Sequence, residues 1–180
     1  MSDQRSCGLA ALLATVAVLL AGCGGPEGQA STGGTSAGGN ATVVRVVDGD
    51  TIVARVDGVE ERVRLIGIDA PESVKQDSPV ECFGPEASAH LKQLLPGGAS
   101  VRLELDQEPR DKYDRLLAYV FRSDDDLFVN RAMVADGYAA AFVYKPNVAY
   151  TPTLQDAGRT ARSTGAGLWT ACSSNLPFPR

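Results

Sequence analysis

Four charged side chains lie close together within residues 43–73, set among Val, Ile and Leu: Asp50, Arg64, Asp69 and Glu72. Carboxylates and guanidinium groups are costly to bury unless they are paired or bind a metal. Carboxylates can bind a hard cation or accept a proton, and guanidinium groups can hold an anion. The pattern therefore indicates either paired surface charges or a site where such chemistry takes place.

The remainder of the chain offers few other catalytic groups. His90 is the only histidine and lies in a predicted helix, which argues against zinc catalysis and a Ser-His-Asp triad. There is no Gly-rich phosphate loop and no internal repeat. The formal net charge is −5 without a long basic run, so we expect no nucleic-acid-binding tail that acts by charge alone.

Five segments rich in β-branched residues predict the strands that must position these charges. The segments are Val43–Val47, Thr51–Val56, Arg62–Ile68, Val101–Leu105 and Leu116–Phe121. The first three form a predicted meander, and Asp57-Gly58 suits a two-residue hairpin turn. Helices are predicted at Pro85–Leu95, Val129–Asp136 (with Gly137 as its cap) and Thr153–Thr164.

Five strands with a helix between the third and fourth predict a five-stranded OB-type β-barrel with about three helices. An open α+β sheet and an SH3-like barrel are the alternatives. In a strict strand, Arg64 and Asp69 would point to opposite faces. Gly67 permits the bend that would bring both side chains to one site, and Pro71 then fixes the turn that presents Glu72.

Five short motifs occur in one order along the chain. They are DGDT (48–51), RLIGIDAPE (64–72), FGPEAS (83–88), DKYDRLLAYV (111–120) and VYKPN (143–147). Together they resemble the staphylococcal-nuclease-like family, also called thermonucleases, from about Thr42 to Trp169. The resemblance implies an OB-fold barrel and Ca²⁺-dependent hydrolysis of phosphodiester bonds in DNA and RNA, with 3′-phosphate products. We expect a monomer.

The resemblance also implies roles for single residues. It implies that Ca²⁺ is bound by two carboxylates and one backbone carbonyl, those of Asp50, Asp69 and Ala70. Glu72 matches the residue proposed to activate the attacking water, as a general base would. Arg64 and Arg115 match the two arginines that grip the phosphate.

A rim that contacts nucleotides is implied in the same way, and its members are Lys112, Tyr113, Tyr144 and Lys145. The two tyrosines could hydrogen-bond a terminal phosphate or stack on a base. The chain departs from the family at two positions. Phe142 stands where members often have a tyrosine, and Ala70 replaces a threonine of which only the carbonyl should matter to the metal.

The N-terminal segment is expected to lie outside the folded domain. Residues 1–22 resemble a lipoprotein signal peptide, with an apolar run at Cys7–Leu20 that ends in the lipobox-like sequence LAGC. Cleavage before Cys23 would leave that cysteine lipidated, followed to residue 40 by a flexible Gly/Ser/Thr linker. We therefore expect an exported protein anchored to the outer face of the cell membrane. An ordinary secretory signal is the alternative.

Two cysteines are left in the expected domain, 41–172, which precedes a tail at 173–180. In an oxidising compartment Cys82 and Cys172 are expected to form a disulfide, with a metal site as the weaker alternative. The competing function is a non-catalytic nucleic-acid-binding OB-fold lipoprotein. Domains that have lost activity would lack charged residues at the positions named above, and none is missing here.

Overall fold

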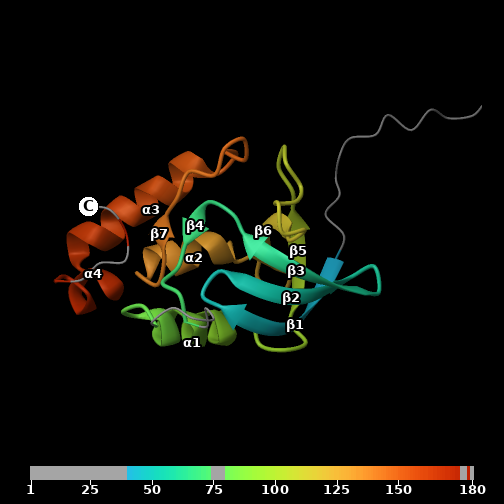
Figure 1. Ribbon diagram of the computed structural model, residues 1–180, viewed down its shortest axis with the longest axis horizontal. Coiled ribbons are helices and arrows are strands. Elements are labelled where there is room, and N and C mark those ends of the chain that lie inside the picture. Colours follow the sequence, from blue (N-terminus) through green and yellow to red (C-terminus); the bar gives the residue numbers. More distant parts are fainter. Residues whose placement is uncertain (1–39, 74–79, 175–177, 179–180) are drawn as a thin grey trace, which may run out of the picture. The chain divides into compact units, whose positions relative to one another are not determined.

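The computed structural model describes residues 40–73, 80–174 and 178 (Figure 1). These residues belong to one compact unit, Gly34–Arg180. The predicted signal peptide, the lipidated Cys23 and all but the end of the linker lie outside the described residues, as does part of the C-terminal tail. Within the described ranges, no helix has the length and hydropathy needed to cross a membrane.

Five strands close into a barrel in the order β1-β2-β3-β6-β5 (Figure 1). Their bounds are β1 Asn40–Asp48, β2 Thr51–Val56, β3 Val59–Leu65, β5 Ser100–Glu104 and β6 Leu116–Arg122. Neighbouring strands are antiparallel except for β3 and β6, which run parallel and join the N-terminal meander to the rest of the barrel. The predicted five-stranded OB-type barrel is confirmed.

The hairpin between β2 and β3 has the predicted two-residue turn. Asp57 and Gly58 have φ values of 49° and 86°, and the flanking residues Val56 and Val59 are paired. Positive φ at both central residues is the requirement of a type I′ turn, whose twist matches that of the strands. The residues before and after this turn are therefore locked in register, which places Thr51 opposite Arg64.

The prediction of one strand at Arg62–Ile68 is wrong. Strand β3 ends at Leu65, the chain turns at Ile66-Gly67, and a separate strand β4, Ile68–Asp69, pairs with β7, Ala140–Ala141. Gly67 has a φ of 79°, and any Cβ at this position would collide with the Leu154 side chain. Arg64 and Asp69 would point to opposite faces of a straight strand, and the bend that brings them to one site lies at Gly67. Glycine fits both the backbone conformation and the packing at this position.

The described residues form four helices outside the barrel, one more than expected. They are α1 Gly84–Leu94, α2 Val129–Ala135, α3 Thr151–Thr164 and α4 Leu168–Ala171. The first three lie within two residues of their predicted bounds, and Gly137, with a φ of 78°, follows α2 as its predicted cap. Helix α1 packs on β1, while α3 packs on α2 and on the short strand β7. The single-turn helix α4 was not predicted.

Two groups of buried apolar side chains hold these elements together. The larger, here called the barrel core, fills the barrel and the space under α1 and α2, and its fully buried members include Ile52, Leu65, Leu117 and Met133. The smaller, here called the C-terminal cluster, consists of Ala140, Ala161, Leu168, Trp169 and Cys172. Cys82 and Phe83 pack against it from the segment before α1.

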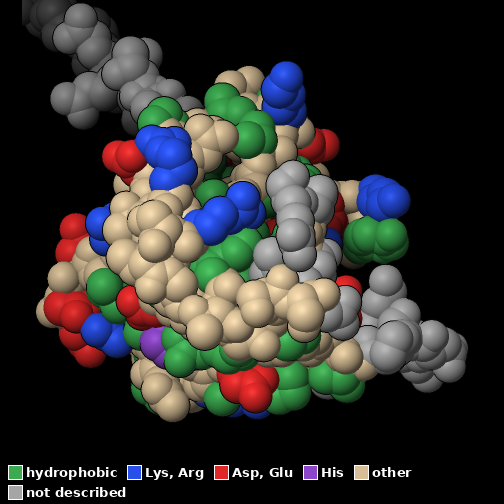
Figure 2. Space-filling model, turned by 90° about the vertical axis from the view of Figure 1, so that its left-hand side faces the viewer, with side chains coloured by type: hydrophobic (Ala, Val, Ile, Leu, Met, Phe, Trp, Pro, Cys, Tyr) green, Lys and Arg blue, Asp and Glu red, His purple; other side chains and the backbone are tan. Residues whose placement is uncertain are grey.

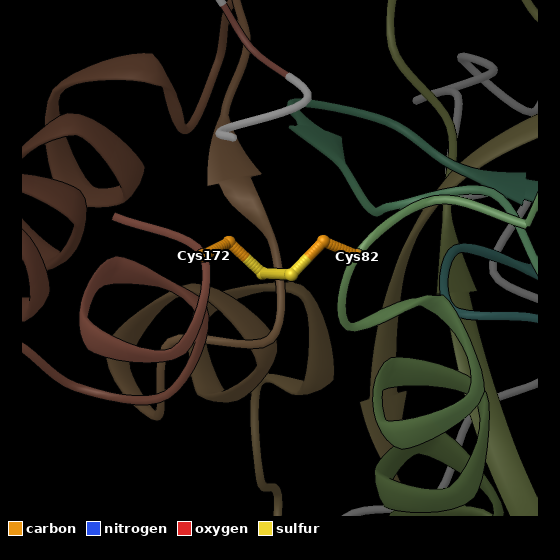
Figure 3. The surroundings of a disulfide bond; sticks show 2 residues. All are labelled: Cys82 and Cys172. Atoms are coloured by element: carbon orange, nitrogen blue, oxygen red, sulfur yellow. A yellow bond between two sulfur atoms is a disulfide. The ribbon is translucent and has the colours of Figure 1, made fainter. Parts of the chain in front are cut away.

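The predicted disulfide joins Cys82 to Cys172, with a Cα–Cα distance of 6.0 Å (Figure 3). Figure 3 shows that it connects the segment leading into α1 with the segment after α4. Because the two cysteines are 90 residues apart, the bond ties the C-terminal cluster to the first half of the chain. The alternative of a metal site at these cysteines is excluded.

Candidate active site

Asp50 and Arg64 form the buried centre of the site. Asp50 lies in the tight turn between β1 and β2, where its N–H donates to Asp48 Oδ1 at 3.1 Å. This local bond is typical of an Asx turn, and it orients the following carboxylate. Asp50 is only 8% exposed, and its carboxylate forms an ion pair with the Arg64 guanidinium from β3.

Arg64 joins three separate segments. Its Nη2 donates to Asp69 Oδ1 and to the Ile68 carbonyl, both at 3.3 Å, while the same guanidinium pairs with Asp50. The Ala70 N–H in turn donates to Asp50 Oδ2 at 3.1 Å. The turn after β1, the end of β3 and strand β4 therefore meet at one guanidinium, which brings both predicted metal-binding carboxylates together.

Burial shifts the pKa values at this centre. Burial lowers the pKa of Arg64, and the nearby Arg115 charge lowers it further, while the Asp69 and Asp48 charges oppose the change. Burial raises the pKa of Asp48 above its ordinary value, against the opposing charge of Arg64 and hydrogen bonds with Thr51. The fold thus disfavours the charged forms of Arg64 and Asp48. Such shifted pKa values are common at functional sites.

Negative charge accumulates beside Asp69. Burial raises the pKa of Asp69; the Glu81 and Glu72 carboxylates raise it further, while Arg64 opposes the rise. Three carboxylates therefore influence one another at the end of β4. The positive charge of Arg64 offsets only part of the effect of burial and of these carboxylates on Asp69.

The backbone of Glu72 is held by Glu81. The Glu72 N–H donates to Glu81 Oε2 at 2.9 Å, and the Glu81 N–H donates to the Glu72 carbonyl at 3.0 Å. Gly84 allows this close approach, because a Cβ there would collide with the Glu72 carbonyl. Cys82 follows Glu81 directly. The disulfide fixes Cys82, and thereby supports the neighbouring Glu81, which holds the backbone of Glu72.

Arg115 is positioned by Asp111 in the loop before β6. Asp111 Oδ1 accepts the N–H groups of Tyr113 and Arg115 at 2.9 and 3.0 Å, and Oδ2 accepts Arg115 Nε at 2.7 Å. Burial alone would raise the pKa of Asp111, but these hydrogen bonds and the Arg115 charge lower it. Although Asp111 lies in a loop, its side chain is only 4% exposed.

The parallel pair of β3 and β6 brings the two arginines to the same end of the barrel. Arg64 is paired with Leu117, two residues beyond Arg115. The Arg115 charge accordingly lowers the pKa values of both Arg64 and Asp48. Two guanidinium groups from different parts of the sequence therefore face one region that also contains the carboxylates.

The predicted rim lies on two loops beside this centre. Tyr113 is 69% exposed, with Lys112 Nζ 5.0 Å from its ring centroid. Tyr144 lies close enough to Arg64 to influence its pKa, and it makes an edge contact with Phe142, with ring centroids 6.3 Å apart. Lys145 is exposed next to Tyr144. The rim thus offers aromatic faces and two lysines to a ligand above the site.

Asn147 connects the two rim loops, a role that was not predicted. Its Oδ1 accepts the Glu108 N–H and its Nδ2 donates to the Glu108 carbonyl, both at 2.8 Å. The residue is fully buried. Asn147 belongs to the VYKPN motif, but its partner lies 39 positions earlier, and no local pattern points to that partner.

Comparison with known proteins identifies the family. Residues 62–171 match the family described as staphylococcal nuclease homologue. The chain belongs to the staphylococcal nuclease family. It is 44% identical over 127 residues to a thermonuclease of Staphylococcus intermedius, which covers 71% of this chain and 74% of that protein. It is 39% identical over 127 residues to a thermonuclease of Staphylococcus hyicus (71% and 73%), and 37% identical over 132 residues to endonuclease YncB of Bacillus subtilis (72% and 61%).

The donor set of this staphylococcal nuclease homologue suits a hard divalent cation. Asp50 and Asp69 offer carboxylate oxygens and Ala70 would add its carbonyl, the ligand type that Ca²⁺ prefers. Burial first, and then the Glu81 and Glu72 charges, raise the pKa of Asp69. In the part of the chain that the structure describes, no three His, Cys, Asp or Glu residues form a group able to hold a metal. Backbone, water and substrate oxygens would complete the ligand set.

Proposed function

We propose that this chain is a Ca²⁺-dependent nuclease that hydrolyses phosphodiester bonds of DNA, RNA or both and leaves 3′-phosphate products. One observation carries the proposal: the Arg64 guanidinium joins Asp50 and Asp69 in a half-buried site that Arg115 also faces. A cation, two phosphate-binding arginines and a nearby general base make up a complete set for phosphodiester hydrolysis. Relatives named thermonuclease and endonuclease support the same activity.

Each residue has a defined task in this proposal. Glu72 accepts a proton from the attacking water. Arg64 and Arg115 donate paired hydrogen bonds to the non-bridging phosphate oxygens and stabilise the charge that grows there. When bound to Asp50, Asp69 and the Ala70 carbonyl, Ca²⁺ supplies positive charge to the same oxygens. The bond from phosphorus to the 5′ oxygen breaks, that oxygen takes a proton from solvent, and the phosphate stays on the 3′ oxygen.

The rim determines how a strand is held. Tyr113, Tyr144 and Phe142 offer ring faces for unpaired bases, and base stacking tolerates any sequence. Lys112 and Lys145 add charge for the phosphates. Stacking on bases and charge on phosphates use groups that DNA and RNA share. We therefore propose that the enzyme accepts single-stranded DNA and RNA and acts as a monomer.

The test is release of acid-soluble nucleotides from single-stranded DNA by the purified protein, in Ca²⁺ or in excess EGTA. Release that needs Ca²⁺ and collapses in Glu72→Ser and Arg64→Ala would support the proposal. Glu86→Ser and Arg62→Ala are matched controls, because both residues are exposed and Arg62 lies on the same strand as Arg64. End-group analysis of the products would identify the phosphate position.

The alternative function is nucleic-acid binding without cleavage. A folded protein that binds single-stranded DNA but releases no nucleotides would favour it. The alternative has less support, because an inactive binding module has no need for Asp50, Arg64 and Asp69 in one ion-paired group.

We further propose that the protein is exported and held at the outer face of the membrane by a lipid on Cys23. The apolar run before LAGC and the Gly-rich segment after it are the support. Radiolabelled palmitate should enter the wild-type protein and the Cys7→Ser variant but not Cys23→Ser. Label in Cys23→Ser, or no label in the wild type, would refute the lipid anchor.

A further inference from the structure

A pocket separate from the candidate active site lies between β7, α3 and α4, with a volume of about 330 Å³. Strand β7 forms its wall through Ala140 and Ala141. Its polar lining consists of side chains that carry hydrogen-bond donors: Gln155, Arg159, Arg162 and Trp169. No carboxylate lines it among the described residues, although the whole chain has a net charge of −5.

The two arginines have charge available for a ligand. The Arg162 guanidinium carbon lies 4.3 Å from the centroid of the Trp169 ring, and none of the described carboxylates forms an ion pair with it. Arg159 pairs with Asp156, but both side chains are at least 70% exposed. Such surface pairs contribute little, so Arg159 can exchange Asp156 for another anion at small cost.

Trp169 lies beside the pocket and forms part of its lining. The residue is 9% exposed, and its Nε1 is buried without a hydrogen bond to any residue within the described ranges. Because Nε1 is buried, the part of the side chain that lines the pocket is the rest of the indole ring. A ligand in the pocket would therefore lie against this ring.

We propose that this pocket binds a phosphate group of the nucleic-acid strand outside the cleavage site. The anion would accept hydrogen bonds from Arg159 and Arg162 beside the Trp169 ring. Guanidinium forks match phosphate oxygens, and a lining of donors without carboxylates favours an acceptor-only ligand. Figure 2 looks onto the face of α3 and α4, where Lys and Arg side chains lie in the upper and central part.

The pocket is close enough to the active site for one strand to reach both. Strand β7 forms the pocket wall and pairs with β4, with Ala140 directly opposite Asp69. The pocket therefore lies within reach of a strand whose scissile phosphate is at Asp69. This role of the pocket rests on the proposed nuclease function. Phosphate binding in the pocket would make the enzyme favour strands long enough to reach from the cleavage site to the pocket.

Trp169 is the only tryptophan of the chain, so its fluorescence reports directly on the pocket. The full-length protein is titrated with inorganic phosphate, and with chloride at matched ionic strength. We expect a saturable change with phosphate alone. Arg162→Gln and Arg159→Gln should each weaken the apparent affinity about tenfold, the loss expected for one charged hydrogen bond. The matched control Arg62→Gln, exposed on the barrel, should leave the titration unchanged.

Cleavage of substrates of two lengths separates a strand phosphate from free phosphate as the ligand. In Arg162→Gln, KM for a long single-stranded oligonucleotide should rise about tenfold, with kcat and cleavage of a dinucleotide unchanged. Equal KM values for variant and wild type would overturn the proposed phosphate binding by the pocket while nuclease activity persists. Equal phosphate titrations of variant and wild type would overturn it as well. Phosphate binding at Trp169 in a protein without nuclease activity would overturn the proposed function instead.

Discussion

The barrel core and the C-terminal cluster hold the two sides of the candidate site by different means. Arg64 lies on barrel strand β3 and Asp50 in the turn between β1 and β2, and these strands pack over a large buried core. Glu72 follows β4 and is fixed through Glu81, next to a disulfide that leads to the small C-terminal cluster. One side is held by packing along many residues, and the other by a few hydrogen bonds and one covalent bond.

This difference separates a part of the candidate site that is held by extensive packing from a part that depends on few contacts. The barrel holds Arg64 and Asp50, and packing of this extent leaves them little freedom. The C-terminal cluster fixes the proposed general base, whose position depends on a small cluster and the bond attached to it. The consequences of disturbing each side should therefore differ in kind as well as in size.

The largest effect should come from removing the disulfide. In Cys82→Ser/Cys172→Ser the loss of a 90-residue cross-link should lower the free energy of unfolding by about 4–5 kcal/mol. Because the bond supports Glu81 and thereby Glu72, kcat should also fall while KM changes little. Urea unfolding and steady-state kinetics measure both. Reduced wild type should match the variant, and an unchanged kcat would show that the barrel alone positions Glu72.

Substitution of the barrel arginine should give the next largest effect. Arg64→Lys keeps the charge but cannot contact Asp50, Asp69 and the phosphate together. We expect kcat to fall by about 10²–10³, equivalent to about 2.7–4 kcal/mol of transition-state stabilisation. Arg62→Lys, two residues away on the same strand and exposed, is the control. Activity within a few-fold of wild type in Arg64→Lys would contradict its proposed role.

Asp111→Asn should have an intermediate effect. The variant leaves Arg115 Nε without its carboxylate, at a cost of about 1–3 kcal/mol in stability near pH 7. The folded-state pKa of Asp111 lies below its unfolded value of about 3.9. Its stabilisation is therefore complete above pH 4 and is lost as pH falls through the folded pKa.

The difference in unfolding free energy between wild type and Asp111→Asn should accordingly shrink in acid. Urea titrations between pH 2 and pH 7 measure it. Asp114→Asn, in the same loop and 88% exposed at its side chain, serves as the control. A difference that stays constant over this range would show that Asp111 does not act through its charge.

The smallest effect concerns Asp69 without metal. Burial and the Glu81 and Glu72 charges raise the pKa of Asp69, so its ionised form opposes folding at neutral pH. In EGTA, Asp69→Asn should raise Tm by no more than about 2–4 °C, the shift that 1 kcal/mol produces in a chain of this size. Added Ca²⁺ should raise Tm in wild type and not in the variant. Equal Ca²⁺ responses would remove Asp69 from the proposed ligand set.

Local patterns were sufficient to predict most of the barrel. Strand β2 has its predicted bounds, and the Asp57-Gly58 turn fixes the next strand in register, because turn chemistry and β-branched residues act over a few positions. The motif order led to the charged group at Asp50, Arg64 and Asp69. Their meeting at one guanidinium could not be predicted in detail, since it depends on the Gly67 bend and on Leu154 packing.

Long-range pairs account for what the sequence did not indicate. Strands β4 and β7 are two residues each, and their pairing joins positions too far apart for any periodicity. Asn147 and Asn130 each satisfy backbone groups of distant segments, Asn130 by donating to the Ile66 carbonyl and accepting the Val120 N–H. Asp111 is the exception, because an Asp followed by Tyr113 and Arg115 N–H groups fits a local Asx-type turn.

The parallel pair of β3 and β6 has a consequence for how the protein folds. Its register joins Val63 to Leu116, whereas the other barrel pairs within the meander join near neighbours in sequence. Contacts across long loops form late, because the entropy of loop closure must be overcome before they contribute. Arg64 and Arg115 meet only when this seam closes. We therefore expect activity to appear only after this seam has closed, later than the structure of the meander, and we expect no activity from an N-terminal fragment that ends before β6.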